Sequence, residues 1–258
     1  MAEHRRPVLV TGGTGTLGRP LVHTLLDAGH PVRVLSRTAR TPAVPDDVEW
    51  VVGDLLTGAG LHEAVEGVAA VIHCASNPRK PDQDLDAAVQ LTLAARAADV
   101  PHLVYISIVG VDVVPTAYYQ VKAKVEEIVE DSGIPWTILR ATQFHDFVAF
   151  LLGLLAKGPV AVVPRGIQDQ PVDVREVAGR LAELVSSGPA GRVDDLGGPQ
   201  VLGVDELMRT YLAATGRRAR IVTIPALGPL RHYRGGGHLA PDRATGRVTF
   251  AEWVERKA

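Results

Sequence analysis

Short apolar runs alternate with helical patterns along the first half of the chain. The runs are nearly continuous in Val, Ile and Leu, which is typical of strands covered on both faces. We expect strands at Val8–Thr11, Val32–Ser36, Val48–Val52, Ala69–His73, Leu103–Ser107 and Trp136–Arg140. We expect helices between them at Leu17–Ala28, Asp84–Ala98 and Tyr118–Asp131. This alternation predicts an α/β fold with a doubly wound parallel sheet of the Rossmann type.

The pattern changes after residue 141, where helical patterns dominate. Short extended pieces are expected at Val160–Val163 and Gln170–Val172, and Arg234–Gly246 is rich in breakers and predicts a loop. The apolar stretch Phe147–Ala156 is shorter than the about 20 residues that span a bilayer, so we expect a buried helix. We therefore predict a sheet domain at residues 1–142. Residues 143–258 would form a smaller, mostly helical part packed on it as one continuous globular unit.

Composition narrows the class of protein. The chain has 258 residues, 46% of them hydrophobic, which suffices for a large core. The formal net charge of −2 gives no reason to expect nucleic acid or an anionic membrane as a partner. Because Cys74 is the only cysteine, an intrachain disulfide is excluded, and the nine histidines show no metal-ligand spacing. We therefore expect no metal site. Because no apolar signal core opens the chain, we expect a cytoplasmic protein. The sequence does not indicate whether the protein forms oligomers.

Four glycines follow the first predicted strand within "VTGGTGTLG", at Gly12, Gly13, Gly15 and Gly18. They match both G-x-G-x-x-G and G-x-x-G-x-x-G, between a strand and a helix that opens near Thr16. Glycines in such a turn let backbone N–H groups approach a pyrophosphate, and the helix N-terminus adds its own N–H groups. The stretch predicts a dinucleotide site; the alternative is a tight turn without a ligand.

The second predicted strand indicates which dinucleotide binds. NAD sites usually carry an acidic residue about 20 residues after the glycines, which bonds the ribose 2′-hydroxyl. Here no acid occurs between Asp27 and Asp46, and Ser36 and Arg37 close the strand, with Arg33 nearby. A guanidinium suits a 2′-phosphate, so we expect NADP(H) to be preferred over NAD(H). The alternative is that Arg37 is an ordinary solvated arginine.

Two further strand ends offer nucleotide contacts. Asp54 follows the third strand, where its carboxylate would accept a hydrogen bond from the adenine amino group, unless it is only a turn residue. Cys74, Ala75 and Ser76 follow the fourth strand, where small side chains leave room for a ribose. We expect the Cys74 thiol to be buried rather than reactive.

The order of motifs resembles a known family. "TGGTGTLG", "GDL", "YISIVGVD", "YYQVKAKVEEIVEDSGIPWTILRATQF" and "VDVREVAGRLAELV" follow one another as in atypical, or extended, short-chain dehydrogenases/reductases of the NmrA-like NAD(P)H-binding group. The resemblance covers nearly the whole chain and is more specific for fold and cofactor than for reaction. The group contains reductases, isomerase-like and epimerase-like enzymes, and regulators that bind the dinucleotide without turning it over.

The resemblance implies a catalytic set of Ser107, Tyr118 and Lys122, with Tyr118 as proton donor, Lys122 as its electrostatic partner and Ser107 as substrate anchor. Tyr118 and Lys122 fit Y-x-x-x-K, and positions i and i+4 share one helix face. Tyr119 is a rival donor, although its i+4 position is Ala123. The alternative for Tyr118 is an amphipathic residue at a helix start.

This chain departs from the family in three places. Only ten residues separate Ser107 from Tyr118, Cys74-Ala75-Ser76 replaces Asn-Ala-Gly, and Arg140-Ala141 replaces Arg-Pro. Lys122 is also expected to contact the nicotinamide ribose. The full predicted cofactor set is Gly12, Thr14, Gly15, Thr16, Leu17, Ser36, Arg37, Asp54, Leu55, Cys74, Ala75, Ser76 and Lys122.

The segment after the sixth strand should reach the ligand crevice, which lies beyond the carboxyl ends of the strands. We expect Gln143 and His145 to contact a polar group of the substrate, and Phe144 and Phe147 to supply apolar walls. Alternatively, both phenylalanines belong to the core, and His145 is a hydrogen-bonded surface residue. Pro229–Leu239 is either a mobile lid or a disordered loop.

These features predict an NADP(H)-dependent oxidoreductase that acts on a small, fairly apolar carbonyl or hydroxyl compound. Two alternatives stay open: a non-catalytic NADP(H)-binding regulator that senses redox state, and a nucleotide-dependent isomerase or epimerase.

Overall fold

The computed structural model describes residues 6–39 and 45–257. The chain divides into two compact units, each built from three segments. Unit 1 comprises Met1–Ser107, Gln120–Leu139 and Val177–Val193, and unit 2 comprises Ile108–Tyr119, Arg140–Glu176 and Asp194–Ala258. The sequence predicted a single boundary near residue 142, whereas a late segment of the chain belongs to unit 1.

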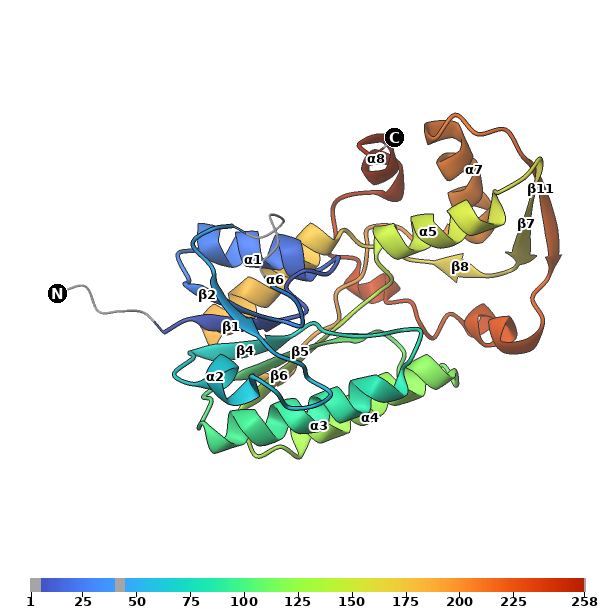
Figure 1. Ribbon diagram of the computed structural model, residues 1–258. Coiled ribbons are helices and arrows are strands. Elements are labelled where there is room, and N and C mark those ends of the chain that lie inside the picture. Colours follow the sequence, from blue (N-terminus) through green and yellow to red (C-terminus); the bar gives the residue numbers. More distant parts are fainter. Residues whose placement is uncertain (1–5, 40–44, 258) are drawn as a thin grey trace. The chain divides into compact units, whose positions relative to one another are not determined.

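Unit 1 is organised around a seven-stranded parallel sheet (Figure 1). Its strands are β1 Val8–Thr11, β2 Val32–Ser36, β3 Glu49–Val52, β4 Ala70–His73, β5 Leu103–Ile108, β6 Trp136–Ala141 and β9 Gly191–Arg192. The spatial order is β3-β2-β1-β4-β5-β6-β9, and Val8 of the central β1 pairs with Val32 on one side and Ala70 on the other. This order is that of a doubly wound dinucleotide-binding sheet, so the predicted fold class is confirmed.

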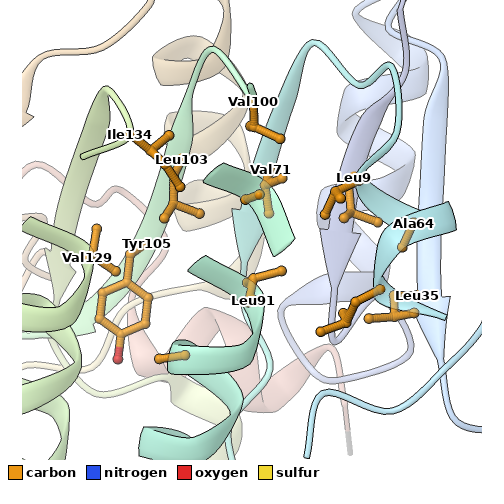
Figure 2. Close-up of a cluster of buried hydrophobic side chains, with 14 of the residues drawn as sticks. Leu9, Leu35, Ala64, Val71, Leu91, Val100, Leu103, Tyr105, Val129 and Ile134 are labelled. Carbon is orange, nitrogen blue, oxygen red and sulfur yellow. The ribbon is translucent and has the colours of Figure 1, made fainter. Parts of the chain in front are cut away.

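Helices cover both faces of this sheet. They are α1 Gly18–Asp27, α2 Leu61–Val65, α3 Asp82–Ala97, α4 Ala117–Glu130 and α6 Val174–Ser187. Helices α1 and α6 lie on one face, and α2, α3 and α4 on the other (Figure 1). Figure 2 shows the core beneath the second face, where Leu9 and Val71 of the strands meet Ala64 of α2 and Leu91 of α3. The apolar strands β1, β4, β5 and β6 are therefore buried on both faces, as such sheets require, whereas Glu49 and Val52 of β3 are exposed.

Unit 2 contains more strand than the sequence predicted. Its helices are α5 His145–Leu155, α7 Val204–Ala214 and α8 Phe250–Glu255; its strands pair as β7 Val160–Arg165 with β11 Arg220–Pro225, and β8 Gln168–Asp169 with β10 Leu202–Gly203. An extended piece was expected at Gln170–Val172. The strand observed there, β8, begins two residues earlier, at Gln168, and Val172 forms an isolated bridge to Phe144. The loop expected at Arg234–Gly246 overlaps two 3₁₀ helices, η1 Gly228–Gly235 and η2 Pro241–Arg243.

Helix α5 corrects the expectation of a buried helix. Val148 and Leu152 on its inner face are buried in the core of unit 2. The outer face exposes apolar side chains, at Phe147, Phe150, Leu151, Leu154 and Leu155. The helix is thus apolar all round but packed on one side only. Across the residues that the structure describes, no helix combines the length and the apolarity needed to cross a membrane.

Candidate nucleotide and substrate site

The glycine turn after β1 is packed so closely that a side chain at Gly12 or Gly18 would run into backbone atoms. A Cβ on Gly18 would lie 2.1 Å from the Gly12 carbonyl oxygen, so the absent side chain lets α1 begin directly against the turn. Gly12 has a φ of +70°, and a Cβ there would lie 2.8 Å from the Ala75 backbone nitrogen. These two glycines therefore serve the packing of helix, strand and neighbouring loop.

Gly15 is different because the described residues crowd it less than Gly12 and Gly18. It is exposed, and a Cβ there would meet only the Gly12 carbonyl oxygen, at 3.2 Å. Packing thus gives no strong reason for a glycine at this position, whereas close approach of a ligand does. No side chain caps the start of α1. Because Arg19 N–H already donates to the Gly15 carbonyl oxygen at 3.1 Å, the N–H groups just before Arg19 are the ones that would face an anion.

The other predicted residues of the turn differ in what they can offer. The Thr14 carbonyl accepts a hydrogen bond from Arg19 Nε at 2.8 Å, which fixes the loop. Thr16 is exposed, so its hydroxyl is accessible. The Leu17 side chain is buried, which leaves only its backbone for a ligand.

The two arginines considered for the 2′-phosphate, Arg33 and Arg37, have different surroundings. Arg33 donates from Nε to Glu49 at 2.7 Å and from Nη1 to the carbonyl oxygens that end α2, of which Glu66 is the nearest at 2.7 Å. Its guanidinium is therefore structural. Arg37 is exposed and has no hydrogen bond or ion pair to another described residue. Within the described part of the chain, the Ser36 hydroxyl makes long contacts of 3.4 Å to Thr38.

Asp54 stabilises a local turn through one oxygen of its carboxylate. Its Oδ1 accepts the Leu56 N–H at 2.9 Å, which is the local turn that the alternative predicted. The side chain is half-buried, and neighbouring Leu55 packs against the unit 1 core. A contact of Asp54 to adenine stays a prediction.

The loop after β4 is held by an acid that sequence reasoning missed. Buried Asp84 accepts the hydroxyl of Ser76 and the N–H of Asn77, at 2.5 and 2.8 Å. Asp84 lies eight residues after Ser76, across a turn, and this spacing matches no motif from which the hydrogen bond could be predicted. Ala75 closes over Gly12. The Cys74 side chain is half-buried, and burial raises the pKa of its thiol to about 12, so the thiol stays protonated at neutral pH.

Ser107 lies near the end of β5, and Lys122 of α4 is hydrogen-bonded to the same strand. Lys122 is 4% exposed, and its Nζ donates to the Ile106 carbonyl oxygen at 3.0 Å and lies 4.3 Å from the Tyr105 ring centroid. Burial lowers the pKa of Lys122 to about 8, against the pull of Asp84 and two further groups. Ser107 is 3% exposed, and its hydroxyl has no hydrogen-bond partner among the residues that the structure describes.

A buried histidine lies beside this lysine and was not predicted. His73, the last residue of β4, shares a 2.8 Å hydrogen bond with the Thr11 hydroxyl and stacks on Tyr105 at 5.6 Å. Burial, with a smaller effect of Lys122, lowers the pKa of His73 to about 3, so the ring is neutral at physiological pH. It supports β1, β4 and β5 at their carboxyl ends, where a ligand of such a sheet binds.

The two tyrosines at the start of α4 face different surroundings. Tyr118 is half-buried and, four residues before Lys122, shares a face of α4 with it. Tyr119 is 3% exposed, and its hydroxyl accepts Gln143 Nε2–H at 2.8 Å. Burial is the main cause that raises the pKa of Tyr119 far above its usual value, so this phenol stays neutral.

The structure corrects one predicted substrate contact. His145 is fully buried: its Nε2 lies 3.0 Å from the Val248 carbonyl oxygen, and its ring packs against Phe250 and Trp253 of α8. It belongs to the core of unit 2 because α8 covers it. Gln143 and Phe144 are half-buried, so both remain candidates for a substrate.

Comparisons with known proteins agree with this geometry. The profile of a protein family described as NAD(P)H-binding matches residues 12–164. A (4-alkanoyl-5-oxo-2,5-dihydrofuran-3-yl)methyl phosphate reductase from Streptomyces griseus is 34% identical over 218 residues, covering 83% of this chain and 75% of the relative. A photosystem II assembly factor from Trieres chinensis is 28% identical over 229 residues, covering 84% and 72%. An NADPH-dependent quinone oxidoreductase from Escherichia coli, solved with NADPH, superposes with a TM-score of 0.83 at 19% identity, covering 97% of this chain and 99% of that one.

Proposed function

The chain belongs to the NAD(P)H-binding family, and on this premise we propose that it is an NADP(H)-dependent oxidoreductase acting on a small, fairly apolar carbonyl or hydroxyl compound. Two similar proteins support the class of substrate. The furanone phosphate reductase and the quinone oxidoreductase are both named for carbonyl compounds. The relatives thus favour reduction of a carbonyl-bearing acceptor.

The unpartnered hydroxyl of Ser107 is the observation that carries this proposal. A buried hydroxyl without a partner costs about 1–3 kcal/mol, so such a group is usually satisfied by a ligand or water. Ser107 lies at the carboxyl end of β5, next to the carbonyl group that holds Lys122. A hydroxyl in this position would anchor a substrate oxygen.

Tyr118 and Lys122 would move the proton. Lys122 is fixed by its bond to Ile106, and a nearby ammonium stabilises phenolate, which eases proton release from Tyr118. The nicotinamide, when bound, supplies or accepts the hydride. The chain's own contribution is to hold the substrate oxygen at Ser107 and to exchange a proton at the Tyr118 hydroxyl.

The nucleotide would be held along the carboxyl edge of the sheet. The N–H groups at the start of α1 and the open surface of Gly15 suit a pyrophosphate. Arg37 would pair with the 2′-phosphate, because its guanidinium is exposed and free among the described residues. Since Arg33 is already engaged with Glu49 and α2, the proposed preference for NADP(H) rests, among the described residues, on Arg37.

A second function is favoured by one comparison. The assembly factor from Trieres chinensis is not named as an enzyme, yet it is similar over most of this chain. A non-catalytic NADP(H)-binding regulator would bind the nucleotide at the same turn and would show no turnover.

Steady-state oxidation of NADPH with 1,4-benzoquinone, 2-cyclohexen-1-one and aliphatic aldehydes tests the two functions. The oxidoreductase consumes NADPH with at least one acceptor, and Tyr118→Phe lowers kcat by about 10²-fold or more because the proton donor is lost. Tyr211→Phe, in the unit 2 core, is the matched control and keeps the wild-type rate. Saturable NADPH binding without consumption by any acceptor would favour the regulator, and a fully active Tyr118→Phe would refute the relay.

A further inference from the structure

Helix α5 of unit 2 presents a stripe of large apolar side chains to solvent. Val148 and Leu152 face the core of the unit and are buried. The outer face carries five side chains that are each 39–55% exposed: Phe147, Phe150, Leu151, Leu154 and Leu155. They follow one another at the i, i+3, i+4, i+7 and i+8 positions of one helix face, and we call them the α5 stripe.

Helix α7 shows that unit 2 does not expose apolar helix faces in general. Its inner side chains belong to the same core as those of α5, whereas its outer face carries Asp205 and Arg209, which form a 2.7 Å ion pair. Within α5, by contrast, Asp146 is the only acidic residue, and no lysine or arginine occurs. The α5 stripe therefore lacks the charged groups with which a surface helix normally meets water.

The area of the α5 stripe is that of an interaction surface. With about 200 Å² for a fully exposed large apolar residue, the five exposed fractions amount to about 440 Å² of apolar surface. Contiguous apolar patches of more than a few hundred Å² usually mark sites of association. Each partner of a stable interface buries about 800 Å², so the stripe alone supplies about half of one partner's share.

We propose that the α5 stripe is the interface of a homodimer, in which α5 pairs antiparallel with α5 of a second copy about a two-fold axis near Leu151. A two-fold interface brings a surface against itself, and a face without charge meets its copy without like-charge repulsion. The inference concerns a surface of unit 2 and does not depend on the proposed function.

The composition of the stripe favours the antiparallel orientation. Its first half carries two phenylalanines and its second half three leucines. Antiparallel pairing places the phenylalanines of one copy against the leucines of the other, so that larger and smaller side chains alternate across the seam. It also opposes the two helix dipoles and brings exposed Lys157, just beyond the end of α5, towards the acidic first turn of the partner helix.

A membrane surface suits the stripe less well. Helices that lie on membranes combine an apolar face with lysines and arginines, which meet anionic headgroups. Helix α5 contains no lysine or arginine, and its other side is buried in the core of unit 2. Vesicle binding is therefore the alternative outcome that the experiment has to exclude.

The experiment measures the mass of the full-length protein by size-exclusion chromatography with light scattering, at about 1 to 100 μM. We expect twice the mass of one chain. Leu151→Lys lies near the two-fold axis and occurs twice in each dimer, so it should weaken association by about a hundredfold or more. Leu93→Lys is the matched control, because Leu93 is also an exposed leucine on a helix, α3 of unit 1; it should leave the dimer intact.

Cross-linking tests the orientation of the two helices. Phe147→Cys and Leu155→Cys proteins, both in a Cys74→Ser background, are mixed and oxidised. Antiparallel pairing joins position 147 of one copy to position 155 of the other. Two copies of position 147 lie about 12 Å apart along the helix axis in this arrangement, too far for a disulfide.

The outcomes decide between the possible occupants of the stripe. A wild-type protein that stays monomeric at the highest concentration overturns the inference, and so does a dimer that Leu93→Lys dissociates and Leu151→Lys does not. Cross-links between two copies of position 147 contradict the antiparallel pair. A monomer that sediments with vesicles of phosphatidylcholine and phosphatidylglycerol assigns the stripe to a membrane instead. If circular dichroism shows that Leu151→Lys does not fold, Phe150→Lys replaces it, because Phe150 is the most exposed residue of the stripe.

Discussion

Alanine at Gly18 and at Gly15 should have opposite consequences, although the two glycines are three residues apart. At Gly18 a Cβ would lie 2.1 Å from the Gly12 carbonyl oxygen and 2.6 Å from the Gly13 Cα. Both obstacles are backbone, so α1 must move away from the turn. Overpacking of this kind costs about 1–3 kcal/mol. With about 2–4 °C per kcal/mol for a chain of this size, we expect Gly18→Ala to lower Tm by about 2–12 °C.

At Gly15 a Cβ meets only one atom of the protein, at 3.2 Å, so Gly15→Ala should change the free energy of unfolding by less than about 0.5 kcal/mol. It should weaken NADPH binding by about tenfold or more, because the methyl group occupies the space that the pyrophosphate needs. Thermal unfolding and nucleotide titration of both variants check this. A Gly15→Ala protein that binds NADPH like the wild type would refute the close approach of a ligand at this turn.

Two further predictions concern stability. Arg33→Ala removes an ion pair and the hydrogen bonds to the end of α2, and should lower the free energy of unfolding by about 1.5–3 kcal/mol without changing nucleotide preference; a lost preference would place Arg33 in the site instead. Burial lowers the pKa of His73 to about 3 and of His102 to about 4. Because these folded-state values lie below the usual 6.5, the stabilisation is complete above pH 6.5 and is lost as pH falls, by up to about 1.4 kcal/mol per pH unit for each ring. Urea unfolding at pH 7 and pH 5 measures this, and His102→Gln, which keeps a partner for Thr137, should reduce the slope; an unchanged slope would contradict the assignment.

The sheet was predictable because its signals are local. The bounds of β1 and β2 agree with the apolar runs, and the glycine turn between β1 and α1 lies where its spacing predicted. Helix α2 was missed because five residues carry too little periodicity to be recognised. Without α2, nothing in the sequence showed that Arg33 binds its carbonyl groups rather than a nucleotide.

The substrate side was harder because distant segments decide it. His145 follows a strand, as a ligand contact would, but α8, more than a hundred residues later, buries it. Pro229–Leu239 was expected to be a mobile lid or a disordered loop, whereas most of it forms the 3₁₀ helix η1, and the Gly237 backbone packs against Gly110. Asp84 is a single acid whose surroundings are set by tertiary contacts.

The most direct test of the central claim is a titration of the protein with NADPH and NADH, followed by tryptophan fluorescence. Trp50 is a suitable reporter, because its Nε1–H donates at 3.0 Å to the carbonyl group of Thr38, the residue after Arg37. We predict saturable quenching by NADPH, with an affinity about tenfold or more above that of NADH, and loss of this difference in Arg37→Ala. If neither nucleotide binds, the glycine turn is only a turn, and both the oxidoreductase and the regulator are contradicted.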